Sequence, residues 1–235
     1  MTKDVFPGAC KCVRAKRLTN GCGNRHNGFT LIELVLVVGI IAVLGALVLS
    51  TVGYIRKKGA GARAEAEISA MAAACENYKA DYGVYPKDPT AGTATDTLDA
   101  KTMGDPANYP TASLVLYRAL SGDRNLDRAV TDLDKNFKID GQSLVPPLSA
   151  LPTSYFTFKP NMLSPAGGTG TVTAIADPFG NSYGYSTAFQ RDLEQGLSPT
   201  HGYNSTFDLW STARLSNNPP SSGTDTITPQ WIKNW

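Results

Sequence analysis

Side chains able to do acid–base, nucleophilic or metal chemistry are few in this 235-residue chain. The only histidines are His26 and His201, and neither stands in an H-E-x-x-H sequence. No G-x-S-x-G or P-loop sequence is present, and no pair of carboxylates is placed by sequence for acid–base work. His201 lies in a stretch rich in Gly, Ser, Thr and Tyr, and we interpret it as an ordinary loop residue. The sequence therefore predicts a protein that is not an enzyme.

The cysteines do not form a recognisable metal site. Cys10, Cys12 and Cys22 lie near the N-terminus with a spacing that fits no common zinc pattern, and His26 is the only candidate for a fourth ligand. Cys75 stands alone beyond them, so no disulfide can form within the chain if the N-terminal segment is removed. We interpret Cys75 as a small buried apolar residue.

Glu33 is the residue whose position most needs a chemical reason. It is the only charge among the 27 residues from Phe29 to Ile55, and Arg56-Lys57-Lys58 follow at once. About 20 apolar residues in a helix cross the core of a bilayer. A carboxylate at the centre of such a helix costs roughly 2.5–3.5 kcal/mol, and less near its end. The sequence predicts a membrane helix over 29–55 with a functional acid near its start.

The charge distribution gives this helix a direction. Residues 1–28 contain six basic residues and one acidic residue, whereas the remainder contains 16 basic and 19 acidic residues. Because short basic flanks stay on the cytoplasmic side, we expect a cytoplasmic N-terminus and an exported C-terminal domain. The remainder shows no basic patch, so no nucleic-acid partner is predicted.

The sequence Gly28-Phe29-Thr30-Leu31-Ile32-Glu33-Leu34 resembles the processing motif of type IV prepilins and type II secretion pseudopilins. In that family a membrane peptidase cuts after the glycine and methylates the new amine. The resemblance implies cleavage between Gly28 and Phe29, N-methylation of Phe29, and an acidic fifth mature residue at Glu33. A plain signal-anchor helix with a chance acid is the alternative.

The cut gives Glu33 a physical role. A positive amine at Phe29 opposes the helix macrodipole, and a carboxylate one turn away offsets it. The same carboxylate can pair with the amine of a neighbouring helix, which the resemblance implies for filament assembly. A buried ion pair contributes little to stability, but it can fix the register between two helices. Glu33 is therefore predicted to be an assembly residue.

The helix is expected to continue well beyond the membrane. No proline occurs between Phe29 and Tyr85, and the position where many family members carry a proline is Ser50 here, so a kink there is in doubt. Gly83 is the predicted C-cap, and Pro86 blocks continuation. An apolar stripe of three- and four-residue steps runs along the second half of the helix. Its members are Ile68, Met71, Ala72, Cys75, Tyr78 and Tyr82.

The sequence after the long helix predicts a small antiparallel sheet that covers this stripe. Residues 87–110 are predicted to be a loop and Ala112–Leu120 a short helix that stops at Ser121-Gly122, while no element is assigned in 122–150. The predicted strands are Tyr155–Lys159, Thr169–Ile175, Ser182–Tyr185 and Thr206–Ser211. The fold class is therefore α+β: a long N-terminal helix, half transmembrane, packed on a small antiparallel sheet in a pilin-like arrangement.

Two late segments sharpen the resemblance. Asp177–Tyr183 is similar to the D-P-W-G-N-P-Y turn of the major type II pseudopilin, with Phe179 for Trp, and Phe207–Ser211 is similar to its F-D-L-W-S strand. The ending from Asp225 to Trp235 resembles a terminal loop that binds calcium in that pseudopilin. Asp225 is the one acidic residue after Ser211, where the family has two or more. The prediction is no cofactor, with calcium at Asp225 as the alternative.

The leading hypothesis is a structural subunit of a type II secretion pseudopilus that supports protein export across the outer membrane. Its expected partners are prepilin peptidase, further copies in a filament, other pseudopilins, the inner-membrane assembly platform and the membrane. A type IV pilin of a surface pilus is the second hypothesis, and a membrane-anchored enzyme or binding protein with a chance motif is the third. The expected parts are a leader (1–28), a transmembrane and polymerisation helix (29–55), the periplasmic half of that helix (56–86) and a globular domain (87–235) with an enlarged insertion (87–176).

Overall fold

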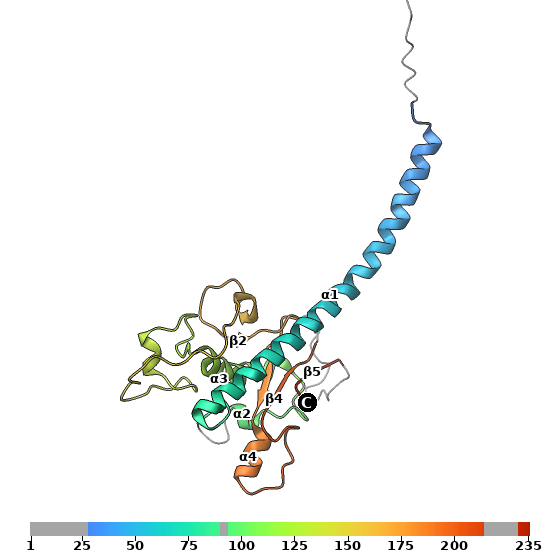
Figure 1. Cartoon of the computed structure of the whole chain (residues 1–235). Helices are drawn as coiled ribbons and strands as arrows, with labels where there is room; N and C mark the ends of the chain where they lie inside the picture. The colour runs from blue at the N-terminus through green and yellow to red at the C-terminus, as the bar shows by residue number, and fades with distance from the viewer. Residues whose placement is uncertain (1–27, 90–93, 214–229) are drawn as a thin grey trace, which may run out of the picture. The chain divides into compact units, whose positions relative to one another are not determined.

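The computed structural model describes residues 28–89, 94–213 and 230–235 (Figure 1). The chain divides into two units, Met1–Ser50 and Thr51–Trp235. Helix α1 (Leu31–Tyr82) begins in the first unit and ends in the second. The long helix followed by small antiparallel sheets confirms the predicted α+β class.

The end of α1 is a glycine cap. Gly83 has a φ of +74°, in the left-handed region that a residue with a Cβ adopts at a cost. Its N–H donates to the carbonyl of Lys79 at 2.7 Å, which satisfies one of the carbonyls left free at a helix end. The predicted C-cap at Gly83 is confirmed.

The apolar stripe on the second half of α1 lies in the core of the C-terminal unit. Ile68, Met71, Cys75 and Tyr78 are buried there, whereas Tyr82 is 48% exposed and marks the edge of the stripe. Full burial of each large apolar side chain is worth about 1.5–3 kcal/mol. Burial also raises the pKa of the Cys75 thiol well above its usual range, so the thiol stays protonated and inert.

Two kinds of element cover this stripe. Helix α3 (Pro110–Ser121) contributes Leu116 and Leu120 to the same core cluster, and it ends at Gly122, whose φ is +80°. Strands β3 (Gly184–Ser186) and β4 (Asp208–Ser211) contribute Tyr185 and Leu209. The predicted second helix is confirmed, and the stripe is covered by a helix as well as by strands.

The strands form two small antiparallel sheets in place of one. The larger has the order β3-β4-β5, with Tyr185 opposite Leu209 and Trp210 opposite Lys233. The smaller pairs β1 (Leu163–Ser164) with β2 (Ala174–Ile175), and β5 comprises Ile232–Lys233. The remaining short elements are α2 (Ala94–Thr97), α4 (Ala188–Glu194) and the 3-10 turns η1 (Pro106–Asn108), η2 (Asp132–Asn136) and η3 (Pro160–Met162).

The strand predicted at Tyr155–Lys159 is wrong. The N–H groups of Tyr155 and Phe156 both donate to the carbonyl of Leu120, at 2.7 and 2.9 Å, at the C-terminal end of α3. A helix leaves such carbonyls free, and here they take the bonds that a sheet would have used. The segment is irregular, although its aromatic rings pack on the core. The strand predicted at Thr169–Ile175 is confirmed only for its last two residues.

The loop predicted at 87–110 is also wrong in part, because it contains α2 and η1. Asp105 caps η1 by accepting a hydrogen bond from the N–H of Ala107 at 2.9 Å, and Pro106 supplies the fixed φ of a first helical residue. In α2 the Asp96 carboxylate accepts a bond from the Thr187 hydroxyl at 2.9 Å. This contact joins residues 91 apart in the chain, so no local pattern predicts it.

Gly184→Ala tests the packing of the larger sheet. A Cβ on Gly184 would overlap the indole ring of Trp210, which is fully buried. Overpacking of this kind should lower the free energy of unfolding by about 1–3 kcal/mol, measured by urea unfolding of the detergent-solubilised chain. Gly59→Ala is the control, because its Cβ meets nothing within 4 Å and should be neutral or slightly stabilising. Equal stability of the two variants would contradict the packing.

Candidate functional site

The junction between Gly28 and Phe29 lies in an exposed segment without regular secondary structure, just before α1. Gly28, Phe29 and Thr30 have no regular secondary structure, and the helix begins at Leu31. Phe29 is 86% exposed, and nothing lies within 4 Å of a Cβ built on Gly28. A peptide bond outside a helix, with exposed neighbours, can be bound in the active site of a protease.

Glu33 closes the first turn of α1 through a capping box with Thr30. Its Oε2 accepts hydrogen bonds from the Thr30 N–H at 2.9 Å and from the Thr30 hydroxyl at 2.8 Å. The Glu33 N–H in turn donates to Thr30 Oγ1 at 3.3 Å. Such reciprocal bonds satisfy N–H groups that a helix start leaves free. The T-x-x-E spacing before an apolar run is the sequence pattern typical of such a cap, and it was not among the features predicted from the sequence.

The apolar side chains of the first half of α1 are exposed. Each large apolar side chain from Leu31 to Val48 exposes between about half and four-fifths of its surface. By length and composition α1 is able to cross a membrane. An apolar surface of this extent needs a covering of lipid or of other protein.

A second group of functional candidates surrounds Asp177. This buried carboxylate accepts hydrogen bonds from the N–H groups of Phe179 and Asn181 at 3.0 and 2.8 Å. It also accepts one from the Ser211 hydroxyl, at 2.5 Å. The two segments that resemble the family's late motifs are therefore in direct contact, through Asp177 of the turn and Ser211 of β4. Burial raises the pKa of Asp177 to about 6, although these bonds oppose the rise.

The same turn packs on the part of α1 that lies in the C-terminal unit. Phe179 shares a small cluster with Ala64 and Ala213. Nearby, the Tyr183 hydroxyl donates to Glu67 Oε2 at 2.8 Å, and Arg63 pairs with Glu67 Oε1 at 2.7 Å. These contacts fix the turn against the helix. Sequence reasoning missed the Glu67–Tyr183 bond, because its partners are 116 residues apart.

Several sequence predictions fall on residues that the structure does not describe. Asp225, the residue of the predicted alternative calcium site, lies in 214–229 and is outside the described residues. His26 and the three N-terminal cysteines lie in 1–27, which are likewise outside the described residues. His201 is described, and its Nδ1 lies 2.7 Å from Asp192 Oδ2 and 3.0 Å from Arg191 Nη2. His201 lies outside any helix or strand, as expected for a loop residue, and these contacts tie its loop to the end of α4.

Comparison with known proteins identifies a motif at the N-terminal end of α1. Residues 23–49 match the family model of the prokaryotic N-terminal methylation motif, a range that includes Gly28, Phe29 and Glu33. The chain thus has a prepilin-type N-terminus. It is 32% identical over 88 residues to type II secretion system core protein G of Pectobacterium carotovorum subsp. carotovorum.

That alignment covers 37% of this chain and 56% of the relative, so the chain spans about half the length of the curated protein that it matches. No solved structure matches the chain. The chain therefore has the N-terminal methylation motif and a partial similarity to a core protein of a type II secretion system. Both are consistent with a single-pass anchor in the inner membrane through the apolar half of α1.

Asp177→Asn tests the buried turn through the pH dependence of stability. The folded-state pKa near 6 lies above the value of about 3.9 in an unfolded chain, so the folded protein keeps a proton that the unfolded chain has released. The stability from this group is full below about pH 4 and is lost as the pH rises through about 6. The free energy of unfolding of the wild type, minus that of the variant, should therefore fall between pH 4 and 7 by up to about 3 kcal/mol.

Urea unfolding at each pH measures this difference. Asp132→Asn, which changes an exposed acid outside the turn, is the matched control to which the profile is compared. A flat profile for Asp177→Asn would show that the buried carboxyl does not titrate in this range.

Proposed function

We propose that the chain is a structural subunit of a type II secretion pseudopilus and not an enzyme. The observation that carries the proposal is the exposed Gly28–Phe29 junction directly before an apolar helix whose first turn contains Glu33. The partial similarity to a core protein of a type II secretion system supports the same role. The subunit would assist protein export across the outer membrane by polymerising through the first half of α1.

Processing comes first in this proposal. Prepilin peptidase removes residues 1–28 on the cytoplasmic side and methylates the amine of Phe29. The segment 29–55 then anchors the chain in the inner membrane, while 56–86 and the globular domain 87–235 lie in the periplasm. The basic N-terminal segment supports this orientation, because short basic flanks remain cytoplasmic.

Assembly depends on the acceptor capacity that Glu33 keeps. Both Thr30 bonds fall on Oε2, and a carboxylate offers about four lone-pair sites. Oε1 can therefore accept a bond from the amine of Phe29 in a neighbouring copy while the capping box stays formed. An unpaired Glu33 carboxylate or Phe29 amine in lipid would be costly. The pair therefore favours the one register between copies in which the two charges meet. Other pseudopilins and an inner-membrane assembly platform are the further proposed partners.

The cleavage proposal is tested by the mass of the mature chain. Expressed with prepilin peptidase, the wild type should have the mass of residues 29–235 plus one methyl group. Gly28→Leu should leave the precursor uncut, because a bulky residue stands before the scissile bond, whereas Gly28→Ala should be cut in part. Intact-mass spectrometry of the membrane fraction gives the result. A mature chain that begins anywhere other than methylated Phe29 rules out both filament hypotheses.

Glu33→Gln tests the assembly role separately from helix capping. Glutamine also completes a capping box, so the helix start should persist while the charge is lost. Cleavage should continue, but the fraction of subunits recovered in sheared filaments should fall about tenfold or more, as expected when an ion pair of about 1.4 kcal/mol or more is removed. Glu65→Gln, an exposed acid farther along α1, is the control and should assemble normally. Normal filaments from Glu33→Gln would refute the pairing.

The secretion role itself is tested in the cell of origin by deletion of the gene. Loss of exported proteins from the medium, with surface pili unchanged, is expected for a pseudopilin. Loss of surface pili with normal export would favour the type IV pilin alternative.

A further inference from the structure

Oxygen-bearing side chains recur at fixed intervals in the loop that follows α3. Asp123, Asn125, Asp127 and Asp134 stand at positions 1, 3, 5 and 12 of a 12-residue segment. These are the positions at which the calcium loop of an EF-hand supplies side-chain oxygens, and position 7, here Ala129, supplies a backbone carbonyl. This register is a property of the sequence and is independent of how the loop is folded.

Two positions depart from the EF-hand pattern. The usual glycine at position 6 is Arg128, but its φ is +76°, so the backbone takes the left-handed conformation for which glycine is normally used. The usual glutamate at position 12 is Asp134, which is shorter by one methylene and keeps the carboxylate. The first departure keeps the backbone conformation of the pattern, and the second keeps a carboxylate at position 12.

The loop is already wound around its two terminal carboxylates. Asp123 accepts hydrogen bonds from the N–H groups of Leu126 and Arg128, both at 2.7 Å. Asp134 Oδ1 accepts bonds from the N–H groups of Arg124 and Asn125 at 2.6 and 2.9 Å. The first and last positions of the segment are therefore held close together, as a shared cation requires.

The two carboxylates are buried without a salt bridge to any described residue, and this second observation points to a ligand. Asp123 is 1% exposed and Asp134 is fully buried. Neither takes part in an ion pair with any side chain in the described part of the chain, and their hydrogen-bond donors are backbone N–H groups and the hydroxyls of Tyr117 and Thr131. Two like charges at neighbouring positions repel each other, and a cation between them would remove that repulsion.

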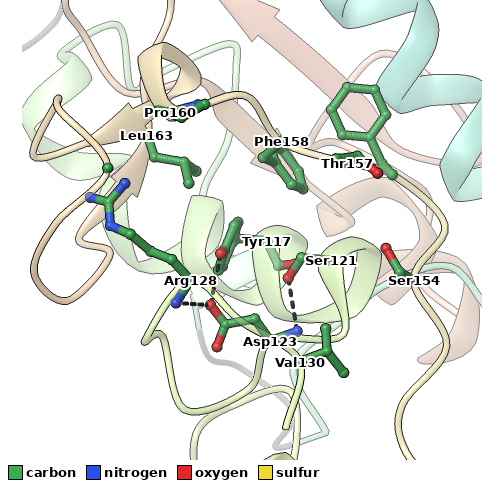
Figure 2. Close-up of a pocket in the computed structure, with 12 residues that line it drawn as sticks. Tyr117, Ser121, Asp123, Arg128, Val130, Ser154, Thr157, Phe158, Pro160 and Leu163 are labelled. Atoms are coloured by element: carbon green, nitrogen blue, oxygen red, sulfur yellow. Dashed lines mark hydrogen bonds between the residues drawn. The ribbon is translucent and has the colours of Figure 1, made fainter.

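The neighbouring arginines form no salt bridge with either carboxylate. Arg118 Nε, on α3, donates to the carbonyl of Arg124 at 3.0 Å. Arg128 Nη2 and Nε donate to the carbonyls of Pro165 and Gly170, at 2.6 and 2.8 Å. Arg124 Nη1 donates to the carbonyl of Phe137 at 2.9 Å. Figure 2 shows the Arg128 guanidinium directed away from Asp123, whose carboxylate instead receives bonds from the Arg128 backbone and the Tyr117 hydroxyl.

We propose that residues 123–134 bind a calcium ion through side-chain oxygens of Asp123, Asn125, Asp127 and Asp134 and the carbonyl of Ala129. The site is separate from the terminal-loop site that the family resemblance implies at Asp225. No group of three or more His, Cys, Asp or Glu side chains in the described ranges forms a ready-made metal site. Binding therefore requires the exposed Asp127, whose Oδ2 now accepts a bond from Asn125 Nδ2 at 2.8 Å, to turn inward. The ion must also replace some of the hydrogen bonds that Asp123 and Asp134 accept, such as those from the Tyr117 hydroxyl and the Thr131 N–H.

The position of the loop defines what the ion would do. Asp123 lines a cavity of about 300 Å³ at the C-terminal end of α3, together with Tyr117 and Phe158 (Figure 2). The Tyr117 hydroxyl donates to Asp123 Oδ2 at 2.8 Å, so the ion is coupled to α3 and hence to the core. Calcium would fix the insertion against the globular domain.

The test is calcium titration of the detergent-solubilised full chain after removal of metals with a chelator, by isothermal titration calorimetry. Asp127→Asn removes a ligand charge from an exposed side chain and keeps the oxygen that accepts the Ala129 N–H, so the loop should still fold. It should weaken binding by about tenfold or more, since changes even to groups that only orient metal ligands act on this scale. Asp132→Asn, an exposed acid at the non-ligand position 10, should leave the affinity unchanged. Asp225→Asn separates this site from the terminal loop and should also leave it intact.

Terbium luminescence supplies a second readout. The Tyr117 ring lies beside the proposed site, so excitation of tyrosine should give terbium emission that calcium displaces, and Tyr117→Phe should reduce that emission. The proposal is overturned if the metal-free wild type takes up no calcium, if Asp127→Asn and Asp132→Asn bind equally well, or if only Asp225→Asn loses binding.

Discussion

The constraint on which the structure depends is the apolar surface of α1, which the chain's own fold covers only in part. The stripe from Ile68 to Tyr78 lies in the core against α3, β3 and β4. The side chains from Leu31 to Val48 have no such cover and remain exposed. One unbroken helix therefore carries two kinds of apolar surface. The first drives folding of the globular domain, and the second requires lipid or further copies of the chain.

Buried aspartates organise the globular domain, in which regular secondary structure is short. Asp177 binds the N–H groups of its own turn and the Ser211 hydroxyl. Asp208 accepts bonds from the N–H groups of Tyr203 and Asn204 at 2.8 and 2.9 Å. In the insertion, Asp123 and Asp134 likewise accept bonds from backbone N–H groups of their own loop. Because an unpaired buried N–H is costly, these carboxylates replace the strand partners that the irregular segments lack.

The parts that sequence reasoning predicted are those with local or periodic signals. Helix α1, its glycine cap at Gly83, α3 and the positions of β3 and β4 follow from apolar spacing and turn residues. The strand expected at Tyr155–Lys159 was wrong because its amides bond to the end of α3, a long-range contact. The Glu67–Tyr183 bond had no local signal at all. The T-x-x-E cap at Glu33 and the spacing of aspartates after Gly122 were visible in the sequence, and the reasoning passed over both.

Glu33 and the pair Asp123–Asp134 show how location decides what a carboxylate needs. Glu33 lies at an exposed helix start, where the Thr30 bonds satisfy one oxygen and the other is accessible to a donor from outside the chain. A neighbouring subunit can supply that donor, so the residue suits assembly. Asp123 and Asp134 are buried, and the N–H groups of their own loop already satisfy part of their acceptor capacity. In the proposed site a small cation balances their charge, and the spacing of oxygens around them favours calcium.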